Sequence, residues 1–254
     1  MADALTRDFA STLARLSDIG YRTVELDGLH GKSAADWKKA LTVAGLKATS
    51  AHYRVATLQY DFDRSLDFAR EVGLAYMICA APRSADGVCP TFAEWQWNAG
   101  FLNTIGFLTA KAGIRLGYHN QGIEFTRYPV RRGPQNQAGV RTGFDEIVDG
   151  TDPALVTLQL DCGWAAAGVD PVALLERTQG RVSLLHIRDV SKGAKANPSL
   201  KVQATAVGQG SLDWKTILTA ARIAGAQGYF VDLHPESADP LPLLRQSATF
   251  MQRL

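Results

Sequence analysis

Eight acidic or histidine residues stand at or just beyond the ends of short apolar segments. They are Glu25, His52, His119, Glu124, Asp161, His186, Asp232 and His234. In the later half of the chain, the intervals from Glu124 to Asp161, His186 and Asp232 are 37, 25 and 46 residues in turn. Three carboxylates and one imidazole that converge would suit Mn²⁺, Mg²⁺ or Co²⁺ more than a structural zinc ion. Such an ion polarises a carbonyl group while flanking carboxylates move protons.

The elements that would bring these side chains together are clearest between residues 155 and 189. The apolar run LVTLQL ends at Asp161, and a second run, RVSLLHI, carries His186 near its end. Between them Pro171 is placed to begin a helix that stops before Gly180. This pattern predicts a strand–helix–strand unit, because buried parallel strands read as continuous apolar runs. Spacing alone is a weak signal, since strand-end acids also cap helices or pair with arginine.

The same alternation extends over the whole chain. We expect seven strands, at Tyr21–Leu26, Lys47–His52, Leu74–Ala80, Ile114–Asn120, 155–160, 181–187 and Tyr229–His234. Helices separate them, and an amphipathic helix opens the chain. The prediction is therefore an α/β fold of the TIM (β/α)₈ barrel type, one strand short. We expect Arg127–Gly143 and Ser191–Val207 to be irregular loops, the first of them basic.

Composition narrows the class of protein. The 254 residues are 46% hydrophobic, with 27 basic and 25 acidic residues giving a net charge of +2. This balance disfavours nucleic acid or an anionic membrane as the main partner. No apolar run approaches the roughly 18 residues that cross a bilayer, and three cysteines suggest no disulfide framework. We expect a single cytoplasmic domain spanning 1–254.

Several motifs in combination resemble the xylose isomerase-like TIM barrel superfamily, the sugar phosphate isomerase/epimerase group. They are GYRTVEL (20–26), AGLKATSAHY (44–53), AGIRLGYHNQGIEF (112–125), LQLDCGWAAAGVDPVALL (158–175), GRVSLLHIRD (180–189) and VGQGSLDWKTIL (207–218) leading to YFVDLHP. The resemblance covers nearly the whole chain. It implies a barrel enzyme that acts on a sugar or sugar derivative.

The resemblance also implies one divalent ion, Mn²⁺, Mg²⁺ or Co²⁺ with Zn²⁺ possible, held by Glu124, Asp161, His186 and Asp232. Glu124 and Asp232 would double as the acid/base pair. This chain departs from the family pattern at three positions: Asp232 replaces the usual Glu, Gln121 replaces the second His of HNH, and Arg188 replaces Lys. The guanidinium is a planar fork rather than a point charge.

Other residues are candidates for binding substrate. They are His52, His119, Trp164, Arg188 and His234. Glu124 and His119 are alternatives for the same role, and Glu25 either supports the site or holds a neighbouring cation. We expect the arginines of the basic loop to form a solvated surface; the alternative is that they bind a phosphate or carboxylate of the substrate.

The resulting hypothesis is a metal-dependent isomerase or epimerase that moves a proton alpha to a sugar carbonyl through an enediolate. The main alternative is a lyase or dehydratase on the same scaffold, which eliminates water or an aglycone from a keto-sugar, keto-glycoside or inosose. A third is a non-catalytic or partner-dependent subunit. The missing strand would leave an edge that another chain can cover, so we expect a homo-oligomer, a dimer.

Overall fold

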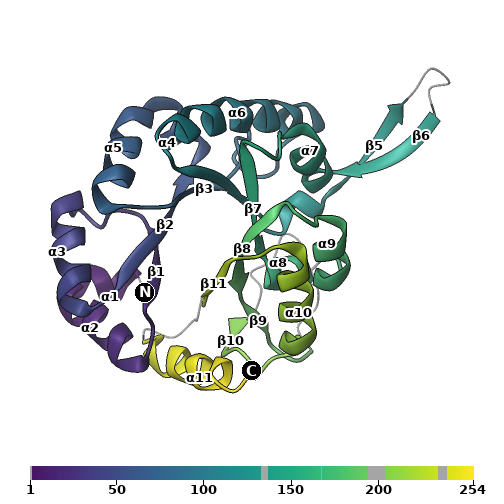
Figure 1. Cartoon of the computed structure of the whole chain (residues 1–254). Helices are drawn as coiled ribbons and strands as arrows, with labels where there is room; N and C mark the ends of the chain where they lie inside the picture. Colours follow the sequence, from purple (N-terminus) through teal and green to yellow (C-terminus); the bar gives the residue numbers. More distant parts are fainter. Residues whose placement is uncertain (1, 133–136, 167, 194–203, 234–238) are drawn as a thin grey trace.

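A curved sheet of seven parallel strands forms the centre of the molecule and helices surround it (Figure 1). The computed structural model describes residues 2–132, 137–166, 168–193, 204–233 and 239–254. In sheet order the strands are β1 (Thr23–Asp27), β2 (Lys47–Arg54), β3 (Tyr76–Ala81), β4 (Arg115–His119), β7 (Val156–Asp161), β8 (Val182–Ile187) and β11 (Gly228–Val231). Spatial order follows chain order, so the predicted seven-stranded, barrel-type α/β fold is confirmed.

The helices form the outer layer. They are α1 (Ala2–Arg7), α2 (Phe9–Ile19), α3 (Ala34–Ala44), α4 (Val55–Tyr60), α5 (Phe62–Val72), α6 (Phe92–Lys111), α7 (Gly143–Gly150), α8 (Cys162–Ala166), α9 (Pro171–Arg177), α10 (Trp214–Ala224) and α11 (Leu241–Met251), with a 3₁₀ turn, η1 (Ile123–Phe125). Ser33 with Asp36 and Thr91 with Glu94 form capping boxes that start α3 and α6. The sequence predicts one helix at the start of the chain, but the structure has two, α1 and α2. Asp8 lies between them and caps the N-terminus of α2.

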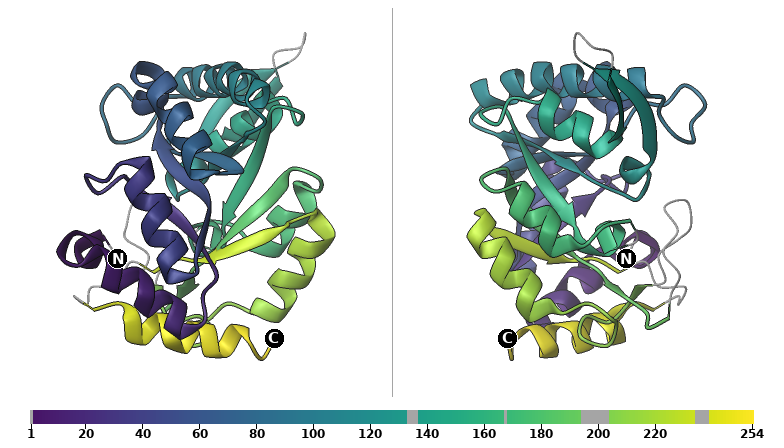
Figure 2. Two further views of the ribbon diagram at one scale, coloured as in Figure 1. Left: turned by 60° about the vertical axis from the view of Figure 1, so that its left-hand side comes forward. Right: turned by 90° about the vertical axis from the view of Figure 1, so that its right-hand side faces the viewer.

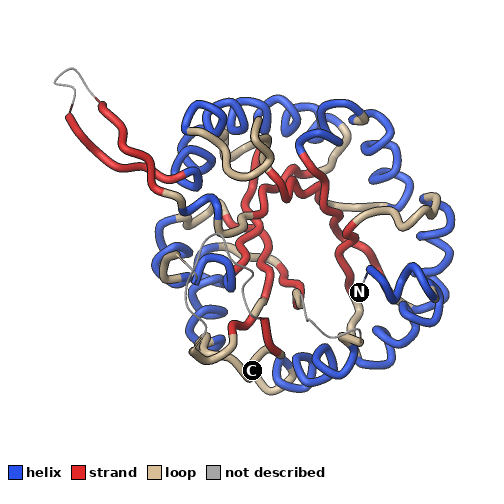
Figure 3. Tube along the Cα trace, turned by 180° about the vertical axis from the view of Figure 1, so that it is seen from behind, coloured by secondary structure: helices blue, strands red, loops and turns tan. Residues whose placement is uncertain are grey.

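The sheet is open between its first and last strands. Within the described residues β1 pairs with β2 and β11 pairs with β8, and the two outer edges face a gap. The helical layer is continuous across this gap, since α11 lies against α2 (Figures 2 and 3). Tyr21 Oη donates to the carbonyl oxygen of Leu244 at 3.0 Å. The helices thus join on the outside while the strands inside stay apart.

The basic segment Arg127–Gly143, predicted to be irregular, contains an antiparallel ribbon instead. Strand β5 (Arg127–Arg132) pairs with β6 (Gln137–Thr142), and the ribbon projects away from the barrel (Figure 1). Pro129 lies opposite Val140; an isolated two-stranded ribbon has only edge strands, where proline is tolerated. The second predicted loop, Ser191–Val207, contains β10 (Ala204–Thr205), which pairs with β9 (Asp189–Val190); residues 194–203 are outside the described part.

Burial places the polar strand ends inside the molecule. Every residue of β7 and β8 is buried, as expected for central parallel strands. At Gly117 on β4 an added Cβ would lie 2.5 Å from Cδ1 of Ile78, so the Ile78 side chain fills the space that a side chain at position 117 would take. No helix among the described residues is long and apolar enough to cross a membrane.

Candidate metal centre and active site

The carboxyl ends of the strands open into a cavity of about 3070 Å³ that continues along the gap in the sheet. Seven polar or aromatic residues of the predicted region line it: Glu25, His52, His119, Trp164, His186, Arg188 and Asp232. They come from β1, β2, β4, α8 and the ends of β8 and β11. In a parallel βα barrel this end of the strands is where active sites lie.

His186 occupies the middle of the cluster, between two carboxylates. Its Nε2 lies 2.5 Å from Oε2 of Glu25, and its Nδ1 lies 3.2 Å from Oδ2 of Asp232. Burial lowers the pKa of the imidazole, but Glu25 and Asp232 outweigh that effect and raise it to about 10. Without a metal ion, His186 is therefore an imidazolium that donates from both nitrogens.

Glu25 is the hub of the hydrogen bonds on the β1 side. Its Oε1 accepts from Ser50 Oγ at 2.5 Å and from Gln159 Nε2 at 2.8 Å, and its Oε2 lies 2.8 Å from His52 Nε2. Burial raises the pKa of this carboxyl, yet His52 and His186 outweigh burial and hold it well below its usual range. Glu25 is thus an ionised, buried acceptor with no proton to give.

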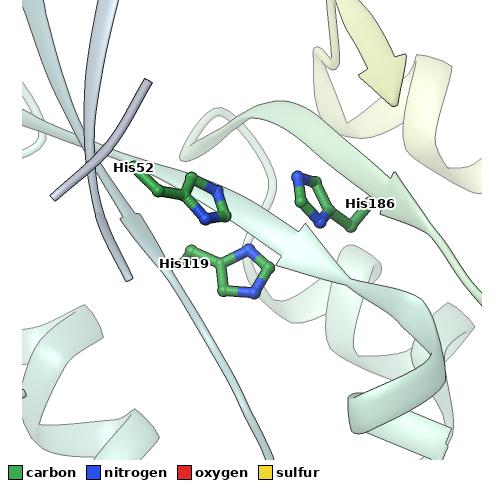
Figure 4. Close-up of side chains that lie close together, drawn as sticks. All are labelled: His52, His119 and His186. Carbon is green, nitrogen blue, oxygen red and sulfur yellow. The ribbon is translucent and has the colours of Figure 1, made fainter. Parts of the chain in front are cut away.

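The imidazole rings of three histidines, His52, His119 and His186, lie close together (Figure 4). The ring of His52 stacks on that of His186 with centroids 5.1 Å apart, and the His119 centroid is 4.6 Å from that of His186. Burial lowers the pKa of His52, but Glu25 more than offsets this and the net shift is upward. Burial, together with His186 and His52, holds the pKa of His119 well below its usual range, so His119 is neutral.

Arg188 joins two of the predicted ligands. Its Nε donates to Oδ2 of Asp161 at 2.9 Å, and its Nη2 donates to Oδ2 of Asp232. The other oxygen of Asp161 accepts from the backbone N–H of Trp164 at 2.9 Å. Gly163 makes room for this arrangement, because a Cβ there would lie 2.7 Å from the carbonyl oxygen of Arg188. The guanidinium also lies 5.7 Å from the centroid of the Trp164 ring.

Among the described residues, two groups of side chains have donor atoms close enough to hold one ion. In each group the atoms lie within 4.8 Å of one another: Asp161, His186 and Asp232 form one, and His52, His119 and His186 form the other. Three of the four residues predicted as metal ligands therefore meet. The carboxylates of this region are those of Glu25, Asp161 and Asp232, and the cations that face them are the guanidinium of Arg188 and the imidazolium of His186.

Glu124 belongs to neither group. It lies on η1 and is fully buried, where its Oε1 accepts from Tyr118 Oη at 2.7 Å and its Oε2 from Gln121 N at 2.9 Å. Burial raises the pKa of this carboxyl to about 7, against these hydrogen bonds. Its role as ligand and proton carrier stays a prediction, and it is not among the residues that line the cavity.

Four of the five residues predicted to bind substrate lie at the cavity. His52, His119, Trp164 and Arg188, predicted to bind substrate, all line the cavity, whereas His234 lies outside the described residues. Sequence reasoning missed Gln159, whose amide links Glu25 to the histidines; its place inside an apolar run was the available signal. It also missed why Asp189 follows the HIR motif: Asp189 accepts from the N–H groups of Gly208 and Gly210 and holds that loop.

Comparison with known proteins places this geometry in a family. A family model described as xylose isomerase-like TIM barrel matches residues 13–254. The chain belongs to this family. The curated inosose dehydratase 1 of Bacillus cereus is 23% identical to this barrel over 277 residues, which cover 96% of this chain and 89% of the relative.

Solved structures agree with this barrel in fold. A sugar phosphate isomerase/epimerase from Parabacteroides distasonis superimposes with a TM-score of 0.78 at 24% identity, covering 98% of this chain and 90% of that one. The IOLI protein with a bound zinc atom gives a TM-score of 0.70 at 14% identity, covering 96% and 91%. In this barrel the Asp161–His186–Asp232 group is a set of donors that could hold a metal ion.

Proposed function

We propose that this protein is a metal-dependent lyase that eliminates water from a keto-polyol of the inosose type. The observation that carries the proposal is that two side chains able to carry protons, His52 and Asp232, lie on either side of His186. Asp232 and His186 also belong to the three-residue donor group. The name of the Bacillus cereus relative, inosose dehydratase 1, supports the dehydratase over the isomerase. Carbohydrate ketones also suit the cavity, which offers imidazole, carboxylate and guanidinium groups to hydroxyls.

The metal ion would be held by Asp161 Oδ2, His186 Nδ1 and Asp232. These donors fit, because they converge and two of the three are carboxylates, which divalent cations accept as ligands. The ion would supply a Lewis acid that polarises the substrate carbonyl and acidifies the neighbouring C–H. Arg188 can stay in place, because a carboxylate oxygen has lone pairs enough for a hydrogen bond and an ion.

Proton transfer falls to the two titratable side chains of the cluster that are most exposed to the cavity. The side chain of Asp232 is 20% exposed and that of His52 is 15% exposed. Asp232, as the base, takes the proton alpha to the carbonyl, and the C–H electron pair becomes the new C=C bond. The β C–O bond breaks with its electron pair, and the leaving hydroxide takes a proton from the His52 imidazolium and departs as water.

His52 thus replaces Glu124 in the predicted acid/base pair, since Glu124 accepts a hydrogen bond from Tyr118 and is not among the residues that line the cavity. Glu25 keeps His52 protonated and oriented while remaining ionised itself. Trp164 and Arg188 form the wall that faces the substrate hydroxyls.

The test is to incubate the metal-loaded protein with an inosose in deuterated water and follow product mass and enone absorbance. We expect a product lighter by one water, formed far more slowly by Asp232→Asn and His52→Gln. A product that keeps all the atoms of the substrate and is heavier only by the deuterium it has taken up would instead identify an isomerase or epimerase. No exchange with an inosose or with a panel of ketoses would favour a non-catalytic or partner-dependent barrel.

A further inference from the structure

Helix α6 runs for 20 residues in the outer layer of the barrel and is apolar on both of its faces (Figure 1). The face toward β4, β7 and α7 consists of the buried residues Trp95, Asn98, Ala99, Leu102, Ile105, Gly106 and Thr109. On the outward face Trp97, Phe107 and Leu108 are 36%, 51% and 37% exposed. A surface helix normally presents polar residues to water on that side. The outward face of α6 therefore has the composition of a contact surface.

The outward residues of α6 recur at alternating intervals of three and four positions. They are Glu94, Trp97, Phe101, Thr104, Leu108 and Lys111, called here the α6 stripe. Glu94 and Phe101 are half-buried and the other four are exposed. The rings of Trp97 and Phe101 stack with their centroids 5.1 Å apart. Alternation of three and four is the spacing by which two helices pack along their length, so the stripe fits another helix.

The α6 stripe is complementary to itself when two copies of the helix run antiparallel. A two-fold axis midway between positions 102 and 103 places Trp97 opposite Leu108 of the second copy. The same axis places Phe101 opposite Thr104, a large residue opposite a small one. A two-fold interface uses the same patch on both copies, and this patch meets that requirement over its whole length.

The charged ends of the stripe favour the antiparallel arrangement. Hydrogen bonds from Thr91 lower the pKa of Glu94, which is therefore ionised at neutral pH. Nζ of Lys111 lies 4.3 Å from the centroid of the Phe107 ring, so the ammonium group stays on the outward face. The two-fold axis brings each Glu94 opposite a Lys111, whereas a parallel pairing would bring like charges together. Charges beside a helix seam set partner and orientation in this way.

Gly100 leaves room for a second helix close to α6. It is exposed beside Phe101, and an added Cβ there would meet nothing within 4 Å. The single chain thus has space for a larger residue, although glycine inside a helix costs about 1 kcal/mol relative to alanine. A glycine lets another backbone approach closely.

We propose that two copies of this chain associate through the α6 stripe, antiparallel about this two-fold axis. The interface differs from the open edge of the sheet, and it is independent of the proposed reaction. The loop before α6 contributes Pro82, Ser84 and Val88 to the cavity, and its Arg83 lies 4.6 Å from the centroid of the Trp97 ring. The second copy therefore packs beside one wall of the active site.

Sedimentation velocity of the full chain between about 1 and 200 µM tests the association. We expect a species of twice the mass of one chain to grow with concentration. Leu108→Glu should raise the dissociation constant at least about tenfold, because it brings a charge against Trp97 of the second copy. The matched control is Val43→Glu on α3, where Val43 is 80% exposed; it should leave the dissociation constant unchanged. A wild type that stays monomeric over the whole range would overturn the proposal.

Cysteine crosslinking tests the position of the axis. Along the helices the two copies of position 104 are about 4.5 Å apart and those of position 110 about 22 Å apart. Thr104→Cys should therefore form a linked dimer on mild oxidation and Ala110→Cys should not. The wild type is the control for Cys89, a native cysteine that is only half-buried.

Three further outcomes would overturn the proposal. A dimer that survives Leu108→Glu and gives no crosslink in Thr104→Cys would form through another surface. Equal crosslinking of Thr104→Cys and Ala110→Cys would show that the helices have no fixed register. A wild type that stays monomeric and sediments with phosphatidylcholine vesicles would assign the outward face of α6 to a membrane surface instead.

Discussion

Oε2 of Glu25 lies 2.5 Å from Nε2 of His186, although 161 positions separate the two residues in the chain. The contact joins the first and the sixth strand of the sheet across the inside of the barrel. A carboxylate on one ring nitrogen of histidine directs the other toward a metal ion, which is the usual support of a metal-bound histidine. Here that other nitrogen, Nδ1, faces Asp232.

Glu25→Gln should lower the pKa of His186 in the metal-free protein, because the Glu25 carboxylate raises that pKa more than the Asp232 carboxylate does. The pKa is about 10 in the wild type, and we expect a decrease of more than about one unit. Titration of the histidine ring nitrogens by NMR measures it. Asp232→Asn serves as the comparison and should lower the pKa less; the reverse order would show that Asp232 governs His186.

The affinity for zinc should rise with pH. His186 must lose its Nδ1 proton to bind an ion, and with a pKa of about 10 it holds that proton at neutral pH. Each unit of pH between about 6.5 and 8.5 should then improve the affinity about tenfold. Calorimetry in two buffers of different ionisation enthalpy should count about one proton released per zinc at neutral pH. If the affinity did not change with pH, His186 would already lack its Nδ1 proton in the metal-free protein, or it would not be a ligand.

Arg188→Met should destabilise the metal-free protein and make it more responsive to metal. The substitution leaves Asp161 and Asp232 without their guanidinium, and a buried pair broken on one side costs about 3–5 kcal/mol. Zinc supplies the missing positive charge, so it should raise the melting temperature more in the variant than in the wild type.

Arg177→Met is the matched control. Arg177 pairs with Asp145 at 2.7 Å but its side chain is 51% exposed, so its loss should lower the free energy of unfolding by about 1 kcal/mol or less. Equal metal responses in wild type and Arg188→Met would contradict the idea.

The sequence was informative where the parallel sheet dictates geometry. Asp161, His186 and Asp232 each stand at the end of an apolar run, and parallel strands bring those ends to one edge. It could not show that His119 lines the cavity and Glu124 does not, because Glu124 lies in a 3₁₀ turn beyond the end of β4. Gln159 was overlooked because an amide is not an expected ligand, and the ribbon was missed because Pro129 and its arginines read as a loop.

Glu124→Gln should stabilise the metal-free protein more at pH 8 than at pH 6. Glu124 has a pKa of about 7 in the folded chain, against 4.5 for an unperturbed carboxyl. Between these values the folded state binds more protons than the unfolded state, so stability falls as pH rises through 7. The full cost, on the order of 3 kcal/mol, applies once the buried carboxyl ionises. Glutamine avoids this cost because it never ionises.

Thermal melts at pH 6 and pH 8 measure the difference, and Glu94→Gln is the control. The Glu94 carboxyl caps α6 and has a lowered pKa, so the effect of this substitution should be the same at both pH values. If Glu124→Gln shifted the melting temperature equally at both pH values, Glu124 would not titrate between pH 6 and 8.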